Sequence, residues 1–296
     1  MQELKGSFVA LVTPMKINGE IDLYALRQLV EWHIESGTDG LVSVGTTGES
    51  ATLNFNDHVK VLEKTISYID NKIVAIAGTG ANSTDEAIEL TKAASLIGYE
   101  FALSVTPYYN KPSQLGLEAH YKKIADSADI KNILYNVPLR TACDLEPVTV
   151  NKLTHHENIV GIKEAVNDPN RYKALIEIAK NSSKPFYVLS GDDPTFFDFM
   201  KSGGDGIISV AANVIPSQVA KIATLSLSGN FEDAEELSQR YKKLFELLFI
   251  ESNPIPVKWM LKKMHKIEGG IRLPLTKLQN KNHASIEDEM LKLDLI

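Results

Sequence analysis

One lysine stands inside an apolar run: Lys163, in the segment NIVGIKEAVND. An apolar interior removes the solvation of the ammonium charge and can lower the pKa of a lysine by up to about 3–5 units. The neutral amine is a nucleophile that forms a Schiff base with a ketone or aldehyde, and the protonated imine then stabilises a carbanion. The alternative is a structural lysine that pairs with adjacent Glu164 or extends its amine to solvent.

The segment GTTGES, residues 45–50, is a glycine-rich turn with two consecutive hydroxyl side chains, Thr46 and Thr47. Oriented backbone N–H groups in such a turn can hold a carboxylate or a phosphate. The segment lacks the lysine spacing of a P-loop, so nucleotide binding is a poor match. An ordinary turn between a strand and a helix is the alternative.

Three tyrosines and an arginine could complete a site for a carbonyl compound. Tyr135, in LYNVP, could pass protons to and from an imine, although a buried tyrosine often makes only one hydrogen bond. Tyr108 and Tyr109 are consecutive and so point in opposite directions, which lets one face its own site and the other a neighbouring chain. Arg140 could hold a carboxylate through its two-pronged guanidinium or form a surface ion pair.

Metal and redox chemistry have little support in the sequence. The seven histidines show no ligand spacing, and His155 and His156 are simply adjacent. Cys143 is the only cysteine, so the chain forms no internal disulfide. We therefore expect lysine chemistry without a metal or another cofactor.

Eight short apolar runs rich in β-branched residues could position these side chains. Continuous apolar runs are typical of parallel strands that are buried on both faces. Amphipathic stretches with helix start and stop signals separate them, among them 22–37, 83–98, 168–180 and 192–204. The runs are 7–14, 39–45, 72–78, 101–107, 132–138, 159–165, 186–191 and 206–212.

This alternation predicts an α/β fold, a (β/α)₈ TIM barrel over residues 1–229, with a doubly wound sheet as the alternative. Three amphipathic stretches without intervening strands then predict a small all-helical C-terminal domain over 230–296. In a barrel of this kind the active site lies at the carboxyl ends of the strands, where most of the apolar runs end in a polar residue. These residues are Thr13, Thr46, Thr47, Thr79, Tyr108, Tyr109, Tyr135, Lys163, Asp192 and Ser209.

The composition of the chain limits the kinds of partner that it is expected to bind. The chain has 296 residues, 44% of them hydrophobic, and a formal net charge of −7 with basic and acidic residues interspersed. This pattern gives no basic surface for nucleic acid or anionic lipid, so a small molecule is the expected partner. No apolar segment reaches the roughly 18 residues of a membrane span, and the first residues do not resemble a secretory signal, which predicts a cytoplasmic protein.

The motifs GTTGESATL, TPYYNKPSQ, YNVPLRT, GIKEA, SGDD and NPIPVKW occur in this order. With them the whole chain resembles the dihydrodipicolinate synthase family, in the pyruvate-dependent class I aldolase superfamily that includes N-acetylneuraminate lyase. The resemblance implies condensation of pyruvate with L-aspartate 4-semialdehyde to 4-hydroxy-tetrahydrodipicolinate, the first committed step of diaminopimelate and lysine biosynthesis. It also implies a homotetramer built as a dimer of dimers.

The resemblance assigns roles to individual residues. Lys163 would form the imine with pyruvate, and Thr46 and Thr47 would hold its carboxylate. Thr47, Tyr135 and Tyr109 would form a proton-shuttling hydroxyl triad, with Tyr109 supplied by the partner subunit. Arg140 would receive the carboxylate of the semialdehyde. Two further positions, Gly191 and Ile208, would line the site with their backbone.

Many bacterial members of this family are inhibited by lysine at the dimer interface, and the resemblance implies the same here. Phe55 stands where the sensitive enzymes usually have a histidine, so the potency of lysine is left open. Glu86 has a second interpretation, because Ser83 and Glu86 have the spacing of a helix capping box. The matching positions are Ser50, Ala51, Phe55, His58, Gly80, Asn82, Glu86 and Tyr108.

Two other functions remain as alternatives. The first is a pyruvate lyase acting on a sialic or keto-deoxy sugar acid, and Arg140 argues against it. The second is a barrel that binds a ligand without catalysis. Retention of Lys163, Tyr135 and Tyr109 argues against that function, because buried polar groups are costly to keep without a use.

Overall fold

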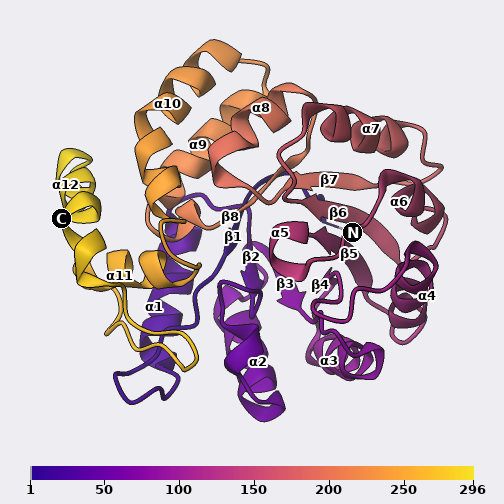
Figure 1. Cartoon of the computed structure of the whole chain (residues 1–296), viewed down its shortest axis with the longest axis horizontal. Helices are drawn as coiled ribbons and strands as arrows, with labels where there is room; N and C mark the ends of the chain where they lie inside the picture. The colour runs from indigo at the N-terminus through magenta and orange to yellow at the C-terminus, as the bar shows by residue number, and fades with distance from the viewer. Residues whose placement is uncertain (1) are drawn as a thin grey trace.

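The computed structural model describes residues 2–296, and its eight parallel strands form a closed barrel. Each strand pairs with the next in the chain, and β8 pairs with β1 to close the ring. Figure 1 shows the strands at the centre and the helices around them. The predicted barrel is therefore confirmed, and the doubly wound sheet is wrong. The strands are β1 Gly6–Ala10, β2 Gly40–Ser43, β3 Val74–Gly78, β4 Phe101–Val105, β5 Lys131–Asn136, β6 Ile159–Glu164, β7 Tyr187–Ser190 and β8 Gly206–Ser209.

Both faces of the strands are buried, which explains why their sequences are continuously apolar. Side chains that alternate along each strand divide into two hydrophobic clusters. In β5, for example, Ile133 and Tyr135 belong to the cluster inside the barrel, whereas Leu134 belongs to the cluster under the helices. This alternation decides which strand residues can reach a site at the barrel mouth.

Nine helices follow the strands before residue 230 in the described chain, and several begin as the sequence predicts. Asp22, Ser83 and Asp168 each accept a hydrogen bond from a backbone N–H in the first turn of their helix. The helices are α1 Leu23–Glu35, α2 Phe55–Ile69, α3 Thr84–Ile97, α4 Gln114–Ala125, α5 Pro138–Thr141, α6 Pro147–Leu153, α7 Pro169–Lys180, α8 Phe196–Lys201 and α9 Pro216–Leu227.

The predicted helix over 192–204 is shorter than expected. Residues Asp193–Thr195 form a 3₁₀ turn, and α8 begins only at Phe196. The reason is that the Asp193 carboxylate accepts hydrogen bonds from Ser209, the last residue of β8, and from Val210 and Ala211, which follow it. An acidic residue that the sequence places at a helix start therefore anchors a neighbouring strand end instead.

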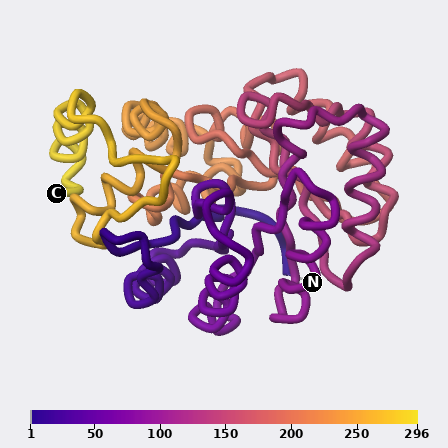
Figure 2. The backbone as a smooth tube through the Cα atoms, turned by 60° about the horizontal axis from the view of Figure 1, so that its bottom comes forward, coloured from indigo at the N-terminus to yellow at the C-terminus, as the bar shows by residue number. Residues whose placement is uncertain are grey.

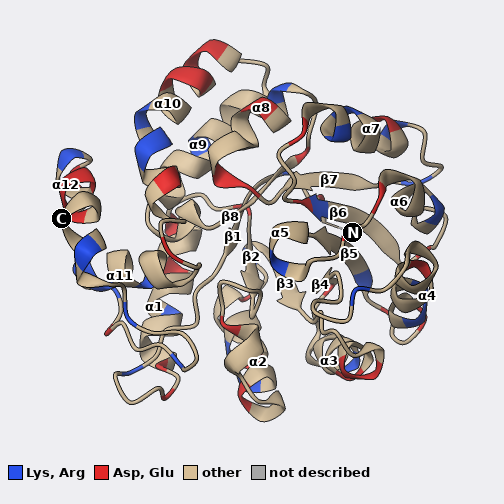
Figure 3. Ribbon diagram, viewed as in Figure 1, with Lys and Arg blue, Asp and Glu red and all other residues tan. Residues whose placement is uncertain are grey.

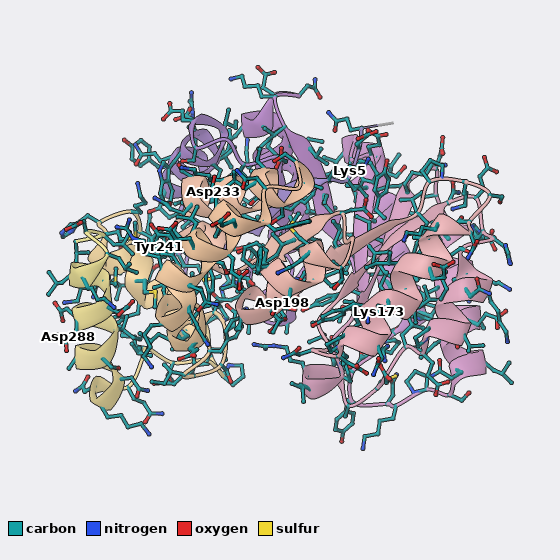
Figure 4. All side chains as sticks on the ribbon, turned by 90° about the horizontal axis from the view of Figure 1, so that it is seen from above. Lys5, Lys173, Asp198, Asp233, Tyr241 and Asp288 are labelled. Carbon is teal, nitrogen blue, oxygen red and sulfur yellow. The ribbon has the colours of Figure 1, made fainter. Side chains whose placement is uncertain are left out.

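The C-terminal region consists of α10 Phe231–Leu247, α11 Ile255–Lys263 and α12 His283–Lys292. Helix α10 packs against α8 and α9, and the Phe245 ring meets that of Phe196 with centroids 6.0 Å apart. In Figure 4, Asp198 marks α8 and Tyr241 marks α10. One hydrophobic cluster continues from the barrel helices into this region. The domain boundary after residue 229 stays a prediction.

The segment after α11 lies against the loop after β1, in the part of Figure 2 where yellow meets indigo, while the two termini lie on opposite sides of the molecule. The Arg272 guanidinium donates a hydrogen bond to the carbonyl of Gly19, and the N–H of Gly270 donates to the carbonyl of Met15. The C-terminal region is thus held on the side of the barrel that carries the loops after β1 and β2.

Charged residues are distributed over most helices without a single-sign field (Figure 3). Among residues 2–296, no helix is long and apolar enough to cross a membrane. No group of three or more His, Cys, Asp or Glu residues in the same range could hold a metal ion.

Candidate active site

Lys163 and Tyr135 lie side by side at the barrel mouth. They are paired in the register of β5 and β6, and the Lys163 Nζ lies 4.3 Å from the centre of the Tyr135 ring. Lys163 is only 5% exposed. Burial lowers its pKa to about 8, with Asp193 acting in the opposite direction and Arg140 adding to the decrease. The amine is therefore neutral far more often near pH 7 than that of an ordinary lysine.

Glu164 does not neutralise Lys163, so that structural alternative is wrong. Adjacent side chains of a strand point to opposite faces, and Glu164 points away from the barrel interior. Its carboxylate accepts from Arg171 Nε at 2.6 Å and from Asn136 Nδ2 at 3.1 Å. The amine next to it forms no ion pair with any residue in the described range.

The Lys163 stem lies over a glycine. A Cβ added to Gly191 would be 2.8 Å from Lys163 Cε and 3.1 Å from Lys163 Cγ. The Gly191 N–H donates to the carbonyl of Glu164 at 2.7 Å, which fixes this close approach. Ile208, on β8, faces the same interior cluster. Both predicted positions thus lie beside the lysine.

The turn after β2 contains two hydroxyls that point to different partners. Burial raises the pKa of the Tyr135 phenol to about 12, while Arg140 and the nearby Thr46 hydroxyl lower it. Thr47 Oγ1 instead accepts from Asn253 Nδ2 at 2.9 Å. The predicted triad of Thr47 with Tyr135 and Tyr109 stays a prediction, and both threonines line the cavity beside the phenol.

Backbone strain accompanies this turn. Val44, the residue after β2, has φ of 53°, a left-handed conformation that a β-branched residue rarely adopts. Its carbonyl oxygen occupies the space that a side chain at Gly78 would need. Strained residues of this kind gather at functional sites, where the surrounding structure holds them.

These groups surround a cavity of about 140 Å³, which we call the lysine-163 cavity. Seven of the eight residues to which the resemblance assigns a role in catalysis or substrate binding line it: Thr46, Thr47, Tyr135, Arg140, Lys163, Gly191 and Ile208. The cavity combines a nucleophilic amine, hydroxyl donors and a guanidinium. This combination suits a keto acid that forms an imine.

A second, larger cavity of about 720 Å³ lies next to the first, and we call it the side cavity. Both cavities are lined by Thr46, Val137, Arg140 and Asn253. Of the eight predicted regulatory residues, seven line the side cavity: Ser50, Ala51, Phe55, His58, Gly80, Glu86 and Tyr108. Asn82 does not line it, but its side chain donates to the Tyr108 carbonyl at 3.3 Å.

Two regulatory candidates also have structural roles. His58 Nε2 lies 2.8 Å from the carbonyl oxygen of Gly78, and burial lowers the pKa of this histidine. The Glu86 N–H donates to Ser83 Oγ at the start of α3, as the capping interpretation predicts. The Glu86 side chain is exposed, and its charge contributes to the raised pKa of Tyr108.

Tyr109 lies outside both cavities of its own chain. It is 89% exposed with φ of 76°, whereas its neighbour Tyr108 lines the side cavity. The two side chains therefore diverge as the sequence analysis expected. An exposed tyrosine next to an active-site loop is available to a second chain.

Two contributors to the site were not identified from the sequence. Asn253 and Lys258 both belong to the NPIPVKW segment, but no role was assigned to either. Lys258 is buried and forms an ion pair with Glu49, at the end of the β2 turn, and it also donates to the Thr13 carbonyl. A polar residue directly before a proline-rich helix start was the only available signal for Asn253.

Comparison with known proteins agrees with this geometry. The family model described as the dihydrodipicolinate synthetase family matches residues 3–292. The 4-hydroxy-tetrahydrodipicolinate synthase of Teredinibacter turnerae is 50% identical over 292 residues, which cover 99% of each chain.

Two solved structures are similarly close. The chloride-inhibited dihydrodipicolinate synthase of Acinetobacter baumannii, complexed with pyruvate, superposes with a TM-score of 0.97 at 46% identity, covering 99% of this chain and 100% of the other. The dihydrodipicolinate synthase of Cyanidioschyzon merolae, with lysine bound, gives 0.94 at 36% identity and covers 100% of both chains.

Proposed function

The chain belongs to the dihydrodipicolinate synthetase family, and from this we propose that it condenses pyruvate with L-aspartate 4-semialdehyde to give 4-hydroxy-tetrahydrodipicolinate. The observation that carries the proposal is the buried, unpaired amine of Lys163 beside the Tyr135 phenol. A lysine in this environment is a nucleophile, and a phenol at this distance can transfer protons.

Imine formation is the first step. The neutral Lys163 amine attacks the keto carbon of pyruvate, and the keto oxygen leaves as water after it has been protonated. Tyr135 supplies and removes the protons, and its high pKa keeps it protonated until they are needed. Loss of a methyl proton then converts the protonated imine to an enamine.

The enamine carbon attacks the aldehyde of the second substrate and forms the new carbon–carbon bond. The amino group of that substrate then attacks the imine carbon and displaces Lys163, which closes the ring and frees the enzyme. The sum is one pyruvate plus one semialdehyde giving the heterocycle and one water. We assign the second substrate's carboxylate to Arg140, whose guanidinium lines the lysine-163 cavity.

We assign the proton relay to Tyr135, Thr46 and the Tyr109 of a second chain. Thr46 is chosen because its hydroxyl lowers the pKa of the Tyr135 phenol, whereas the Thr47 hydroxyl accepts a hydrogen bond from Asn253. Thr46 and Thr47 together offer hydroxyls and turn N–H groups to the pyruvate carboxylate. No metal or nucleotide enters this scheme, and dialysis against a chelator should leave the rate unchanged.

Borohydride reduction in the presence of pyruvate tests the central step. Reduction converts an imine to a stable lactyl adduct, which peptide mass mapping locates. We expect the adduct on Lys163. Lys258 is the internal control, because it is equally buried but ion-paired with Glu49. An unmodified Lys163 in folded protein would overturn the assignment.

The aldehyde partner needs a separate assay. We expect turnover with aspartate semialdehyde and little with sugar aldehydes, because Arg140 provides a guanidinium for a second carboxylate. A faster reaction with sugar aldehydes would favour the sugar acid lyase.

We propose lysine as an inhibitor that binds the side cavity. The support is the gathering of Ser50, His58, Glu86 and Tyr108 around one space, with Phe55 adding an apolar wall. The measurement is a lysine titration of the wild type and of Glu86→Ala, which should need a much higher lysine concentration for the same inhibition. Full activity of the wild type in millimolar lysine would overturn this assignment.

We also propose a cytoplasmic homotetramer made from two dimers. The exposed Tyr109 supports a dimer in which each chain completes the site of the other. A single free cysteine is compatible with a reducing compartment. Analytical ultracentrifugation would measure the assembly.

A further inference from the structure

Asn253 connects the C-terminal region to the pyruvate-binding turn. It lies between α10 and α11, is 6% exposed, and lines the lysine-163 cavity. Its Nδ2 donates to Thr47 Oγ1 at 2.9 Å, and its carbonyl oxygen accepts from Arg140 Nη2 at 3.3 Å. One residue thus contacts two of the side chains that we assign to the binding of substrate carboxylates.

The direction of the hydrogen bond between Asn253 and Thr47 determines which group the Thr47 hydroxyl proton can reach. A hydroxyl has one proton to donate and can accept through its lone pairs. Because Thr47 Oγ1 accepts from the amide, its own proton is free for another acceptor. No acceptor for it lies within hydrogen-bond distance among residues 2–296, and Thr47 lines the cavity. The free donor therefore faces the space that a bound anion would fill.

The orientation of the Asn253 amide is supported by its surroundings. Its Oδ1 is enclosed and has no hydrogen-bond partner in the described chain. The opposite orientation would enclose an NH₂ group with two unpaired donors in place of one unpaired acceptor, which is less favourable. It would also let Thr47 donate its proton to the amide and remove it from the cavity.

We propose that Asn253 is a positioning residue that holds the Thr47 hydroxyl as a donor to the carboxylate of the keto acid on Lys163. The inference rests on the proposed function, since it assumes a keto acid in the lysine-163 cavity. It assigns to the C-terminal region a part in recognising the first substrate. A structural role alone would stabilise the segment between α10 and α11 without changing the affinity for the keto acid.

Two substitutions separate these roles. Asn253→Ala removes the donor, and Asn253→Asp keeps the shape but offers an acceptor that draws the Thr47 proton away from the cavity. The readout is the pyruvate concentration that gives half-maximal borohydride trapping on Lys163. We expect an increase of about 10-fold for Asn253→Ala and a larger one for Asn253→Asp, as for loss of a hydrogen bond to a charged group. The maximal extent of trapping should change much less.

A double-substitution cycle with Thr47→Val tests the mechanism. If Asn253 acts through the Thr47 hydroxyl, Asn253→Ala should add little to the effect of Thr47→Val. The matched control is Asn282→Ala. Asn282 is also a buried asparagine of the C-terminal region, but its side chain donates to Glu251 and does not contact Thr47. The Asn282→Ala variant should reach half-maximal trapping at the same pyruvate concentration as the wild type.

The outcomes distinguish this inference from the proposed function. Absence of any adduct in the wild type overturns the proposed function and this inference with it. Normal trapping in the wild type, with unchanged half-saturation in folded Asn253→Ala and Asn253→Asp, overturns only the role of Asn253. Full additivity with Thr47→Val does the same. Should one Asn253 variant fail to fold, the other together with Thr47→Val still decides the question.

Discussion

At the scale of single residues, two buried lysines show how surroundings decide chemistry. Lys163 lies in a cavity lined by hydroxyls, apolar groups, Arg140 and Asp192, and forms no ion pair in the described chain. Lys258 instead donates to the Glu49 carboxylate and to the Thr13 carbonyl. Burial lowers the pKa of both lysines. The Glu49 carboxylate opposes this decrease in Lys258 through an ion pair and a hydrogen bond, whereas Asp193 acts on Lys163 without such a bond. One amine is thereby kept reactive and the other holds two segments together.

The pKa of Lys163 predicts the pH dependence of imine formation. With a pKa of about 8, roughly a tenth of the amine is neutral at pH 7, about 300-fold more than at the ordinary value of 10.5. The initial rate of pyruvate trapping at saturating borohydride should therefore rise with pH and level off above about pH 8. Stopped-time trapping between pH 6 and 9.5 measures it. A rate still rising tenfold per pH unit above pH 9 would contradict the assignment.

The lowered pKa of Lys163 also predicts that this residue destabilises the folded protein. Its pKa is lower folded than unfolded, so the unfolded state binds more protons between about pH 8 and 10.5, and stability rises with pH across that range. Below pH 8 the full penalty is present. Lys163→Met should therefore raise the free energy of unfolding at pH 7, by up to about 3 kcal/mol. Urea titrations of both proteins should show a smaller difference at pH 10 than at pH 7.

At the scale of elements, the strands were predictable because burial on both faces leaves a continuous apolar run. The helix starts at Asp22 and Ser83 were predictable because their caps are local hydrogen bonds. The start at 192–204 was misplaced because Asp193 bonds to residues 16 to 18 positions away, a contact that no local pattern reveals.

In the site as well, residues at the ends of neighbouring strands could be predicted, whereas contacts between residues far apart in the sequence could not. Lys163 and Tyr135 were predicted together because neighbouring parallel strands end at the same rim. The sequence could not distinguish the hydroxyls of Thr46 and Thr47, because the two residues are adjacent and both line the cavity. Asn253 could not be paired with Thr47 across 206 residues without the fold.

Gly191 gives a prediction at this scale, because it lets the end of β7 approach β6. A methyl group there would lie 2.8 Å from Lys163 Cε. Gly191→Ala should displace the Lys163 amine and reduce turnover by at least about 100-fold, as small misplacements of reacting groups do. Turnover assays and circular dichroism measure activity and folding. The control is Ala94→Gly, which changes α3 away from the site. Gly98→Ala would not serve, because Gly98 has φ of 104°, a conformation that alanine rarely adopts.

At the scale of the whole molecule, the role proposed for the exposed Tyr109 requires two chains for one complete site. If the partner supplies this phenol, Tyr109→Phe and Lys163→Ala chains should complement each other when mixed. A mixed dimer would contain one site with Lys163 from one chain and Tyr109 from the other. After subunit exchange at equal amounts, about a quarter of wild-type activity should return. No recovery in exchanged, dimeric protein would show that Tyr109 acts within its own chain or not at all.

Two contacts of the turn after β2, a hydrogen bond with Asn253 and an ion pair with Lys258, also affect the order in which the protein folds. They join residues more than 200 positions apart, Thr47 to Asn253 and Glu49 to Lys258. Such distant contacts form late, because long loops must close first. During synthesis, all eight strands are made before Asn253 leaves the ribosome. A nascent chain that stops after α10 Phe231–Leu247 would thus have every strand but would lack the contacts that hold the turn after β2. Full affinity for the keto acid should therefore emerge only with about the last sixth of the polypeptide.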